Sequence, residues 1–278
     1  MACSSKTAKA KLETRENGGS PIHEHDKPAY AVTYGEKEKV DQLIQQWLGR
    51  SVSDNEWIQI AGGLYDAQVS VSFERKPDFT AEDLVYYDII KITSKHPVIV
   101  PEVNRGAGLE IYLYKSSETG EIVVRLENFC LLPTAPKGMG TEMFARMVAQ
   151  LRKLPVKKIV TSAGRRTPDD ERKYGRDLVG YYVWGVLGFD QTLEKIYADQ
   201  QFDYWKSLPR PDERFKNCRT LLDLLHSEGG KEWWKENRRP CTLEFDLREN
   251  SRSVQILEQY LNRPQHYDLL SLGGGIFL

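Results

Sequence analysis

Several features that would narrow the class of protein are scarce or absent in this 278-residue chain. Its four cysteines are widely spaced and form no Cys-X-X-Cys pair, so we predict neither a metal site nor a disulfide framework. This pattern fits a protein of a reducing compartment. No apolar run approaches 18 residues, so we expect no transmembrane helix and no membrane partner. The N-terminal segment has no apolar signal core, and we expect a cytoplasmic protein.

The chain also has no large excess of positive or negative charge, since its formal net charge is −1. Nothing in the overall charge therefore favours binding to nucleic acid or to an anionic membrane. One local exception is the segment from Arg152 to Arg176, which contains nine Lys or Arg residues but only three acidic residues. Within it, Arg165 and Arg166 are candidates for contacting RNA or another acidic partner. The alternative is a solvated basic surface balanced by acids elsewhere.

Hydrophobic periodicity indicates a mixed α/β chain. Residues 1–28 are polar, and we predict that they form a disordered tail. Apolar residues at helical spacing predict a helix over 36–48, and Ser53 with Glu56 forms a capping-box pattern for a second helix. Alternating or apolar runs then predict four strands. These are residues 67–73, 87–93, 109–114 and 121–132, preceded by a short strand over 31–34.

The second half of the chain is more helical, and it contains no internal repeat and no Pro- or Ser-rich linker. Apolar stripes predict a helix that ends at Leu151 and another that begins near Arg176. Later helices are expected over 221–225, from 229 and from Ser251. Strands are expected over 156–163 and 242–247.

Two glycines, Gly138 and Gly140, stand where the strand 121–132 should lead into the helix that ends at Leu151. A glycine turn at a helix start lets backbone N–H groups approach an anion, which the helix dipole also favours. A phosphate-binding loop and an ordinary strand-to-helix turn both fit this pattern. A Walker-type nucleotide loop is excluded because no Lys-Ser/Thr pair follows Gly140.

Residues 121–190 resemble the core of the GNAT-type acyl-CoA N-acyltransferase superfamily. The strand that ends before Pro133 leads to Lys137-Gly138-Met139-Gly140 at a helix start, and the strand 158–163 follows after one helix. A further helix then runs into Leu187-Gly188-Phe189, which is similar to the family's Gly-Phe ending. The preceding order of two helices and antiparallel strands also resembles the family.

The resemblance implies an α/β fold with a mixed, splayed β-sheet flanked by helices. The GNAT-like acyl-CoA-binding domain would span 29–200, and a C-terminal α-rich extension, 201–278, would pack on it. It further implies acetyl-CoA as co-substrate and transfer of an acetyl group to an amine that the sequence does not identify. The implied acyl-CoA contacts are the main chain around Asn128, Cys130 and Leu132, the loop Lys137, Gly138, Met139, Gly140 and Thr141, and Arg165 and Arg166 at the 3′-phosphate.

Acyl transfer to an amine needs a base for the ammonium and an acid for the departing thiolate. Glu127 is the candidate base, because burial within an apolar strand would raise its pKa; an outward-facing glutamate is the alternative. Tyr182 or Tyr181 is the candidate acid. Two positions differ from the family's pattern, since Ala135 replaces an Arg or Gln and Trp184 replaces the usual tyrosine. They define a second hypothesis, a catalytically inactive GNAT-like module that binds CoA or a protein.

Overall fold

We describe the protein from a computed structural model of the whole chain. The predicted tail, 1–28, and residues Arg165 and Arg166 lie outside the described residues. The structure describes residues 31–78, 85–99, 108–132, 134–163, 180–198, 209–237 and 239–262.

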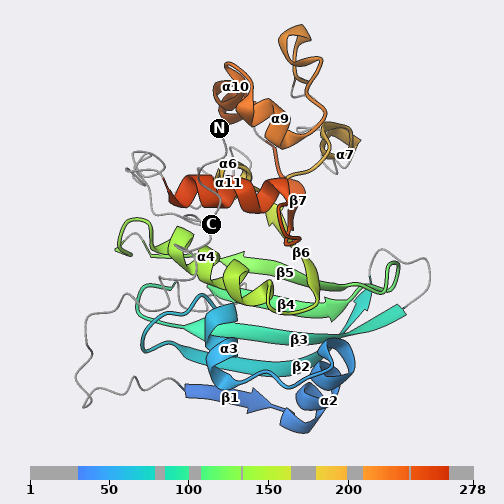
Figure 1. Cartoon of the computed structure of the whole chain (residues 1–278), viewed down its shortest axis with the longest axis vertical. Coiled ribbons are helices and arrows are strands. Elements are labelled where there is room, and N and C mark those ends of the chain that lie inside the picture. The colour runs from blue at the N-terminus through green and yellow to red at the C-terminus, as the bar shows by residue number, and fades with distance from the viewer. Residues whose placement is uncertain are drawn as a thin grey trace, which may run out of the picture.

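One seven-stranded mixed β-sheet organises the chain, and its strands lie in the order β1-β2-β3-β4-β5-β6-β7 (Figure 1). Strands β2 to β5 pair antiparallel, β1 pairs parallel with β2, β5 pairs parallel with β6, and β7 pairs antiparallel with β6. The prediction of an α/β fold with a mixed sheet flanked by helices is confirmed. The strands are β1 (Ala31–Gly35), β2 (Gln68–Asp78), β3 (Val85–Lys95), β4 (Leu109–Lys115), β5 (Ile122–Phe129), β6 (Val156–Ala163) and β7 (Cys241–Asp246).

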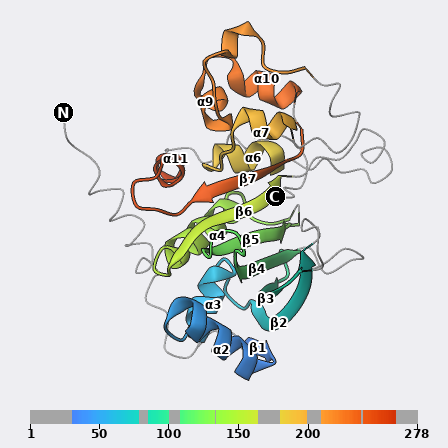
Figure 2. The same ribbon diagram turned by 90° about the vertical axis from the view of Figure 1, so that its right-hand side faces the viewer.

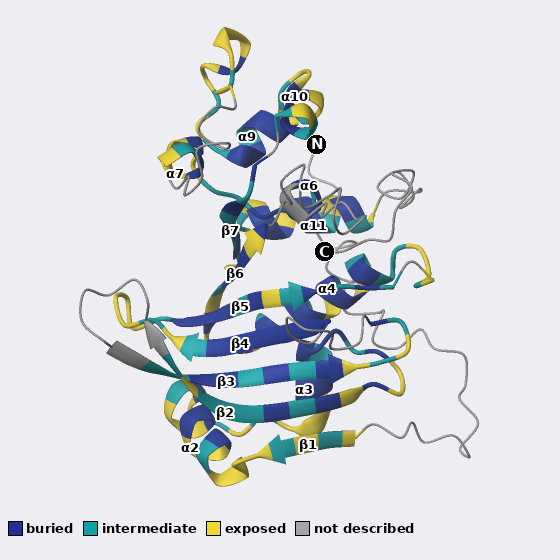
Figure 3. Cartoon of the chain, turned by 180° about the vertical axis from the view of Figure 1, so that it is seen from behind, coloured by how far each residue is buried: buried dark blue, intermediate teal, exposed yellow. Residues whose placement is uncertain are grey.

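The described helices gather on one face of the central strands. Helices α3 and α4 lie in front of the sheet in Figure 1, and no described helix crosses β3, β4 or β5 from behind in Figure 3. Figures 1 and 2 place α7, α9 and α10 beyond the β7 edge. The helices are α2 (Lys37–Leu48), α3 (Asp54–Ile60), α4 (Met139–Leu151), α6 (Gly180–Val186), α7 (Leu193–Ala198), α9 (Leu221–His226), α10 (Gly230–Glu236) and α11 (Arg252–Leu261), with a 3-10 turn η1 (Glu213–Phe215).

Local sequence accounts for most element boundaries. Helix α3 begins at the predicted capping box. The Ser53 side chain accepts the Glu56 backbone N–H, and the Glu56 side chain accepts the Ser53 backbone N–H. Helix α2 ends at Gly49, whose φ of 71° is left-handed and suits glycine. The strand predicted over 121–132 ends earlier, at Phe129, whereas α7 and η1 have no counterpart in the predicted elements.

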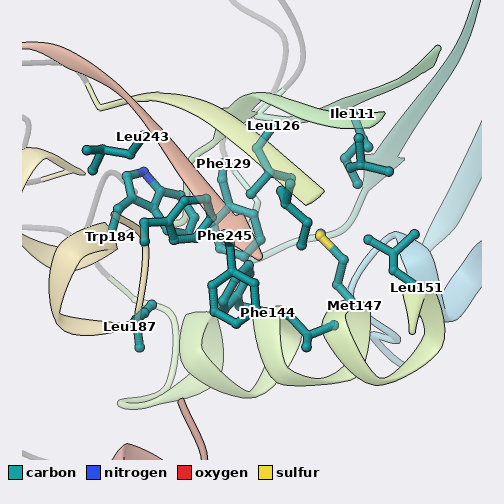
Figure 4. Packing of buried hydrophobic residues seen from close by; sticks show 14 of the residues in the cluster. Ile111, Leu126, Phe129, Phe144, Met147, Leu151, Trp184, Leu187, Leu243 and Phe245 are labelled. Atoms are coloured by element: carbon teal, nitrogen blue, oxygen red, sulfur yellow. The ribbon is translucent and has the colours of Figure 1, made fainter. Parts of the chain in front are cut away.

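An aromatic cluster joins α4, α6 and the strands beside them (Figure 4). We define it as Phe129, Phe144, Trp184, Phe189 and Phe245, all of which are buried. Phe144 lies at its centre, with ring centroids 5.6 Å from Trp184 and 5.3 Å from Phe245. The cluster therefore connects the glycine-initiated helix α4 with β7 near the C-terminus.

Gly188 allows the backbone of α11 to approach the end of α6 closely. A Cβ at this position would come within 2.5 Å of the Ser253 carbonyl oxygen, and its φ is 107°. The Gly-Phe ending is therefore required by the packing of α11 against the end of α6. Strand β7 also lies within the predicted extension 201–278, so this part of the chain completes the sheet as well as adding helices.

Replacing Phe144 by Ala should lower the free energy of unfolding by about 3–5 kcal/mol, because it leaves a cavity in the aromatic cluster. Urea unfolding followed by tryptophan fluorescence measures this change. The control is Glu142→Ala on the exposed side of the same helix, for which we expect a change within about 0.5 kcal/mol. Equal losses in both variants would contradict the central role of Phe144.

Glu56 should make stability depend on pH. The Arg50 side chain, which donates to it at 2.6 Å, lowers the pKa of Glu56 to about 2. A lowered folded-state pKa stabilises the protein above the unfolded value, near 4.5, and this contribution is lost as pH falls toward 2. We expect Glu56→Gln to cost on the order of 1–2 kcal/mol at pH 7 and progressively less below about pH 4.5. Chemical denaturation across this pH range checks it, and a constant difference would refute it.

Candidate functional site

A β-bulge lies at the end of β5. Ile111 of β4 pairs with Leu126, but the next pair is Glu110 with Asn128, so Glu127 is an extra residue in β5. Such a bulge bends its strand and redirects side chains, and bulges are frequent near active sites. Here it falls in the strand that leads into the glycine turn.

Strands β5 and β6 stop pairing at the same place. Their last register pair is Leu126 with Thr161, although β5 continues to Phe129 and β6 to Ala163. Beyond the bulge, the Cys130 N–H donates to the Gly108 carbonyl on the β4 side. Because backbone groups alternate along an extended chain, the N–H and C=O of Phe129 point to the other edge, toward β6.

The side chains at this end of β5 are packed in the core. Phe129 is 2% exposed and Leu131 is 4% exposed. The Trp184 ring packs edge-on against the Phe129 ring with centroids 5.7 Å apart. A ligand at this edge would therefore lie beside packed aromatic side chains.

The glycine turn is more open. Gly138 has a φ of 81° and is the residue before α4, and its carbonyl accepts the Glu142 N–H at 3.0 Å. A Cβ at Gly138 would meet no atom within 4 Å, so space is available over the start of this 13-residue helix. Lys137 beside it is exposed. The turn is therefore open at Gly138, whereas Gly140 is buried and the Met139 N–H already donates to the Pro136 carbonyl at 3.1 Å.

Glu127 faces outward, which was the alternative to a buried base. Its side chain is 39% exposed and forms an ion pair of 2.8 Å with Arg125. Strand alternation accounts for this exposure, because Leu126 faces the core and its neighbours Arg125 and Glu127 therefore lie on the opposite face. Arg125 also donates to the Ser162 hydroxyl of β6 at 3.1 Å.

A buried carboxylate that the sequence reading missed lies next to this pair. Glu110 is 4% exposed and accepts hydrogen bonds from the Tyr112 hydroxyl, from Lys91 at 3.1 Å and from the Asn128 amide at 3.4 Å. Desolvation raises the pKa of Glu110, but the bonds from Tyr112 and Lys91 outweigh it and the net pKa is lowered. Glu110 is therefore ionised at neutral pH.

These residues belong to a network on the face of β2 to β5 opposite α3 and α4, which we call the back-face network. Lys91 bridges Glu110 to Glu74 at 3.2 Å, and Lys76 donates to the Tyr112 hydroxyl. Alternation along residues 109–114 places Glu110 and Tyr112 on the same face of β4. That alternation was the available signal. The network consists of Glu74, Lys76, Lys91, Glu110, Tyr112 and Asn128.

Both predicted tyrosines, Tyr181 and Tyr182, belong to α6. Tyr182 is 7% exposed, and the Lys235 ammonium lies 4.7 Å from its ring centroid. The side chain of Tyr181 lies outside the described residues. Trp184 is buried within the aromatic cluster, so its position is explained by packing.

A groove of about 520 Å³ lies elsewhere, where β6 begins and β7 ends. It contains none of the site residues expected from the sequence. Its lining is strongly mixed in charge, and its charged pairs include Lys158 with Glu244 at 3.0 Å. The lining comprises Glu121, Lys157, Lys158, Asp190, Gln191, Thr192, Thr220, Leu222, Glu244, Asp246, Arg248, Arg252 and Ser253.

Comparisons of the chain with protein-family models, with curated proteins and with solved structures found no match. In the part of the chain that the structure describes, no helix combines the length and the apolar character needed to cross a membrane. The same residues contain no group of three or more His, Cys, Asp or Glu side chains arranged to hold a metal ion. A functional assignment therefore rests on the geometry around β5 and α4.

Glu110→Gln should destabilise the fold by about 1–3 kcal/mol, because the bonds that Lys91 and Tyr112 donate to a buried charged carboxylate become bonds to a neutral amide. The matched substitution Glu127→Gln should change the free energy of unfolding by less than about 1 kcal/mol, because the Arg125–Glu127 pair is exposed. Urea denaturation of both variants at pH 7 measures the contrast. Similar losses for the two would show that Glu110 is not the key charge of the network.

Proposed function

We propose that the protein is an acyl-CoA-dependent N-acyltransferase that transfers an acetyl group to an amine. One observation carries the proposal. The bulge at Glu127 and the end of β5–β6 pairing at Leu126 come directly before the glycine turn that opens α4. Together they give a separated strand edge and an anion-binding helix start within one short stretch of chain, as the resemblance to the GNAT-type superfamily implies.

Each part of an acyl-CoA would meet a different feature of this stretch. The N–H groups of Gly138, Gly140 and Thr141 and the α4 dipole favour a pyrophosphate, and the exposed Lys137 adds positive charge. The Met139 N–H donates to the Pro136 carbonyl at 3.1 Å and would have to leave it to bind a ligand. The edge of β5 at Phe129 and Leu131 supplies backbone groups that a pantetheine arm could pair with, like an added strand.

The chemistry assigns roles to residues near that edge. Glu127 is the candidate base that takes a proton from the substrate ammonium, so that the free amine can attack the thioester carbon. The new C–N bond forms and the C–S bond breaks, and the thiolate takes a proton from an acid for which Tyr182 and Tyr181 are the candidates. The nitrogen then loses its remaining extra proton to give a neutral amide.

The second candidate function is CoA or protein binding without transfer. The observation that favours it is the burial of Trp184 against Phe129, because the indole N–H is not an acid at neutral pH and the ring is fixed by core packing. In that case the glycine turn would hold a ligand, but no thioester would reach Glu127.

Calorimetric titration with acetyl-CoA tests the ligand. We expect saturable binding that Lys137→Glu weakens about tenfold, because it reverses a charge beside the phosphate groups. Lys115→Glu, the same charge reversal in the exposed last residue of β4, is the control and should leave the affinity within about twofold. Absence of binding by the unmodified protein would eliminate both candidate functions that involve CoA.

Release of CoA thiol in the presence of an amine panel separates the two candidates once binding is established. Transfer predicts amine-dependent thiol release that Glu127→Gln lowers about 10²-fold or more, the usual contribution of a general base. Binding alone predicts no release with any amine. An unchanged rate in Glu127→Gln would remove Glu127 from the proposed mechanism while leaving transfer intact.

A further inference from the structure

The exposed ion pair on β5 is suited to exchange its partners. Arg125 and Glu127 are each 39% exposed, and a pair of this kind contributes about 0–1 kcal/mol. A ligand that supplies a carboxylate to Arg125 and an ammonium to Glu127 would therefore replace the internal contact at little cost. Nearby Glu110 is not available in this way, because three donors already bind its carboxylate.

Each member of the pair has a neighbour of matching hydrogen-bonding type. Arg125 donates to the Ser162 hydroxyl oxygen, which leaves the hydroxyl proton free to donate to a carboxylate. The side-chain amide N–H of Asn128 donates to the Glu110 carboxylate. The side-chain carbonyl oxygen of Asn128 is then left to accept a hydrogen bond from an ammonium. Donors thus gather at Arg125 and Ser162, and acceptors gather at Glu127 and Asn128.

The charge of the surrounding face agrees with a ligand of no net charge. The back-face network and the pair together hold three cations, Lys76, Lys91 and Arg125, against three carboxylates, Glu74, Glu110 and Glu127. A polyamine or a polyanion would find no excess of opposite charge here. A molecule that carries one ammonium and one carboxylate would match both halves of the pair.

The position of the pair links it to the proposed reaction. Arg125 and Glu127 flank Leu126, the last residue of β5 that pairs with β6. We infer that the acceptor is an α-amino acid, whose carboxylate binds Arg125 and Ser162 and whose ammonium binds Glu127 and Asn128. This inference rests on the proposed function, because Glu127 both binds the ammonium and takes its proton. The specificity for a free carboxylate lies with Arg125, outside the bond-forming step.

Ligand binding can be measured without any acyl donor. Calorimetry with the standard α-amino acids should find at least one that binds the unmodified protein. For that amino acid, the amine that lacks the carboxylate and the N-acetyl derivative that lacks the ammonium should each bind about tenfold more weakly or worse. Equal binding of the plain amine, or no binding by any amino acid, would overturn the inference.

Two variants locate the two ends of the ligand. Arg125→Gln should weaken binding of the amino acid about tenfold but leave the plain amine within about twofold. Glu127→Gln should weaken the amino acid about tenfold but leave the N-acetyl derivative within about twofold. Arg214→Gln, which breaks the exposed Arg214–Asp212 pair on η1, is the matched control and should change none of these affinities. Loss of affinity that does not depend on which ligand group is present would also overturn the assignment.

Failure of this inference differs from failure of the proposed function. Thiol release with plain amines, without any binding of amino acids, would keep the acyltransferase and discard the amino acid site. Amino acid binding that follows the predicted pattern, without any binding of acetyl-CoA, would keep the site and discard the acyltransferase.

Discussion

The single extra residue in β5 is the constraint on which the rest of the site depends. With Glu127 inserted, Leu126 still faces the core and Asn128 still reaches Glu110, but the strand no longer follows β6. Strand alternation sets Glu127 beside Arg125 in partial exposure, and the extra residue then brings Asn128 to the same face. The backbone irregularity thereby coincides with the end of the parallel pairing and directs the chain toward α4.

The sequence predicted the elements better than their surroundings. The helix over 36–48, the capping box at Ser53 and the strand over 156–163 follow from periodicity and local hydrogen bonding, which neighbouring residues determine. The exposure of Glu127, one of the two alternatives, follows from strand alternation around the core-facing Leu126. The bulge beside it could not be predicted, because a bulge depends on how β4 and β5 align. Glu110 was missed for a related reason, since its partners Lys91 and Asn128 come from two different neighbouring strands.

The back face of the sheet contains a buried charge, the carboxylate of Glu110. The face of an antiparallel sheet that is not packed on the core commonly carries polar side chains, and here it also buries a carboxylate among two lysines, a tyrosine and an asparagine. Replacing such buried charges with apolar groups is often neutral or stabilising, so stability alone is a poor reason to keep them. The network is better explained as a rigid support that fixes the rotamers of Asn128 and Tyr112 beside the exposed pair.

The position of β7 has a consequence for how the molecule assembles. Its partner β6 ends at Ala163, but the residues that pair with it follow only after all of α6 to α10. Closing so long a loop delays the contact in folding, because its entropy must be offset before the pairing stabilises anything. During synthesis, β6 is therefore an open edge strand until the last part of the chain emerges, and Phe245 completes the aromatic cluster late.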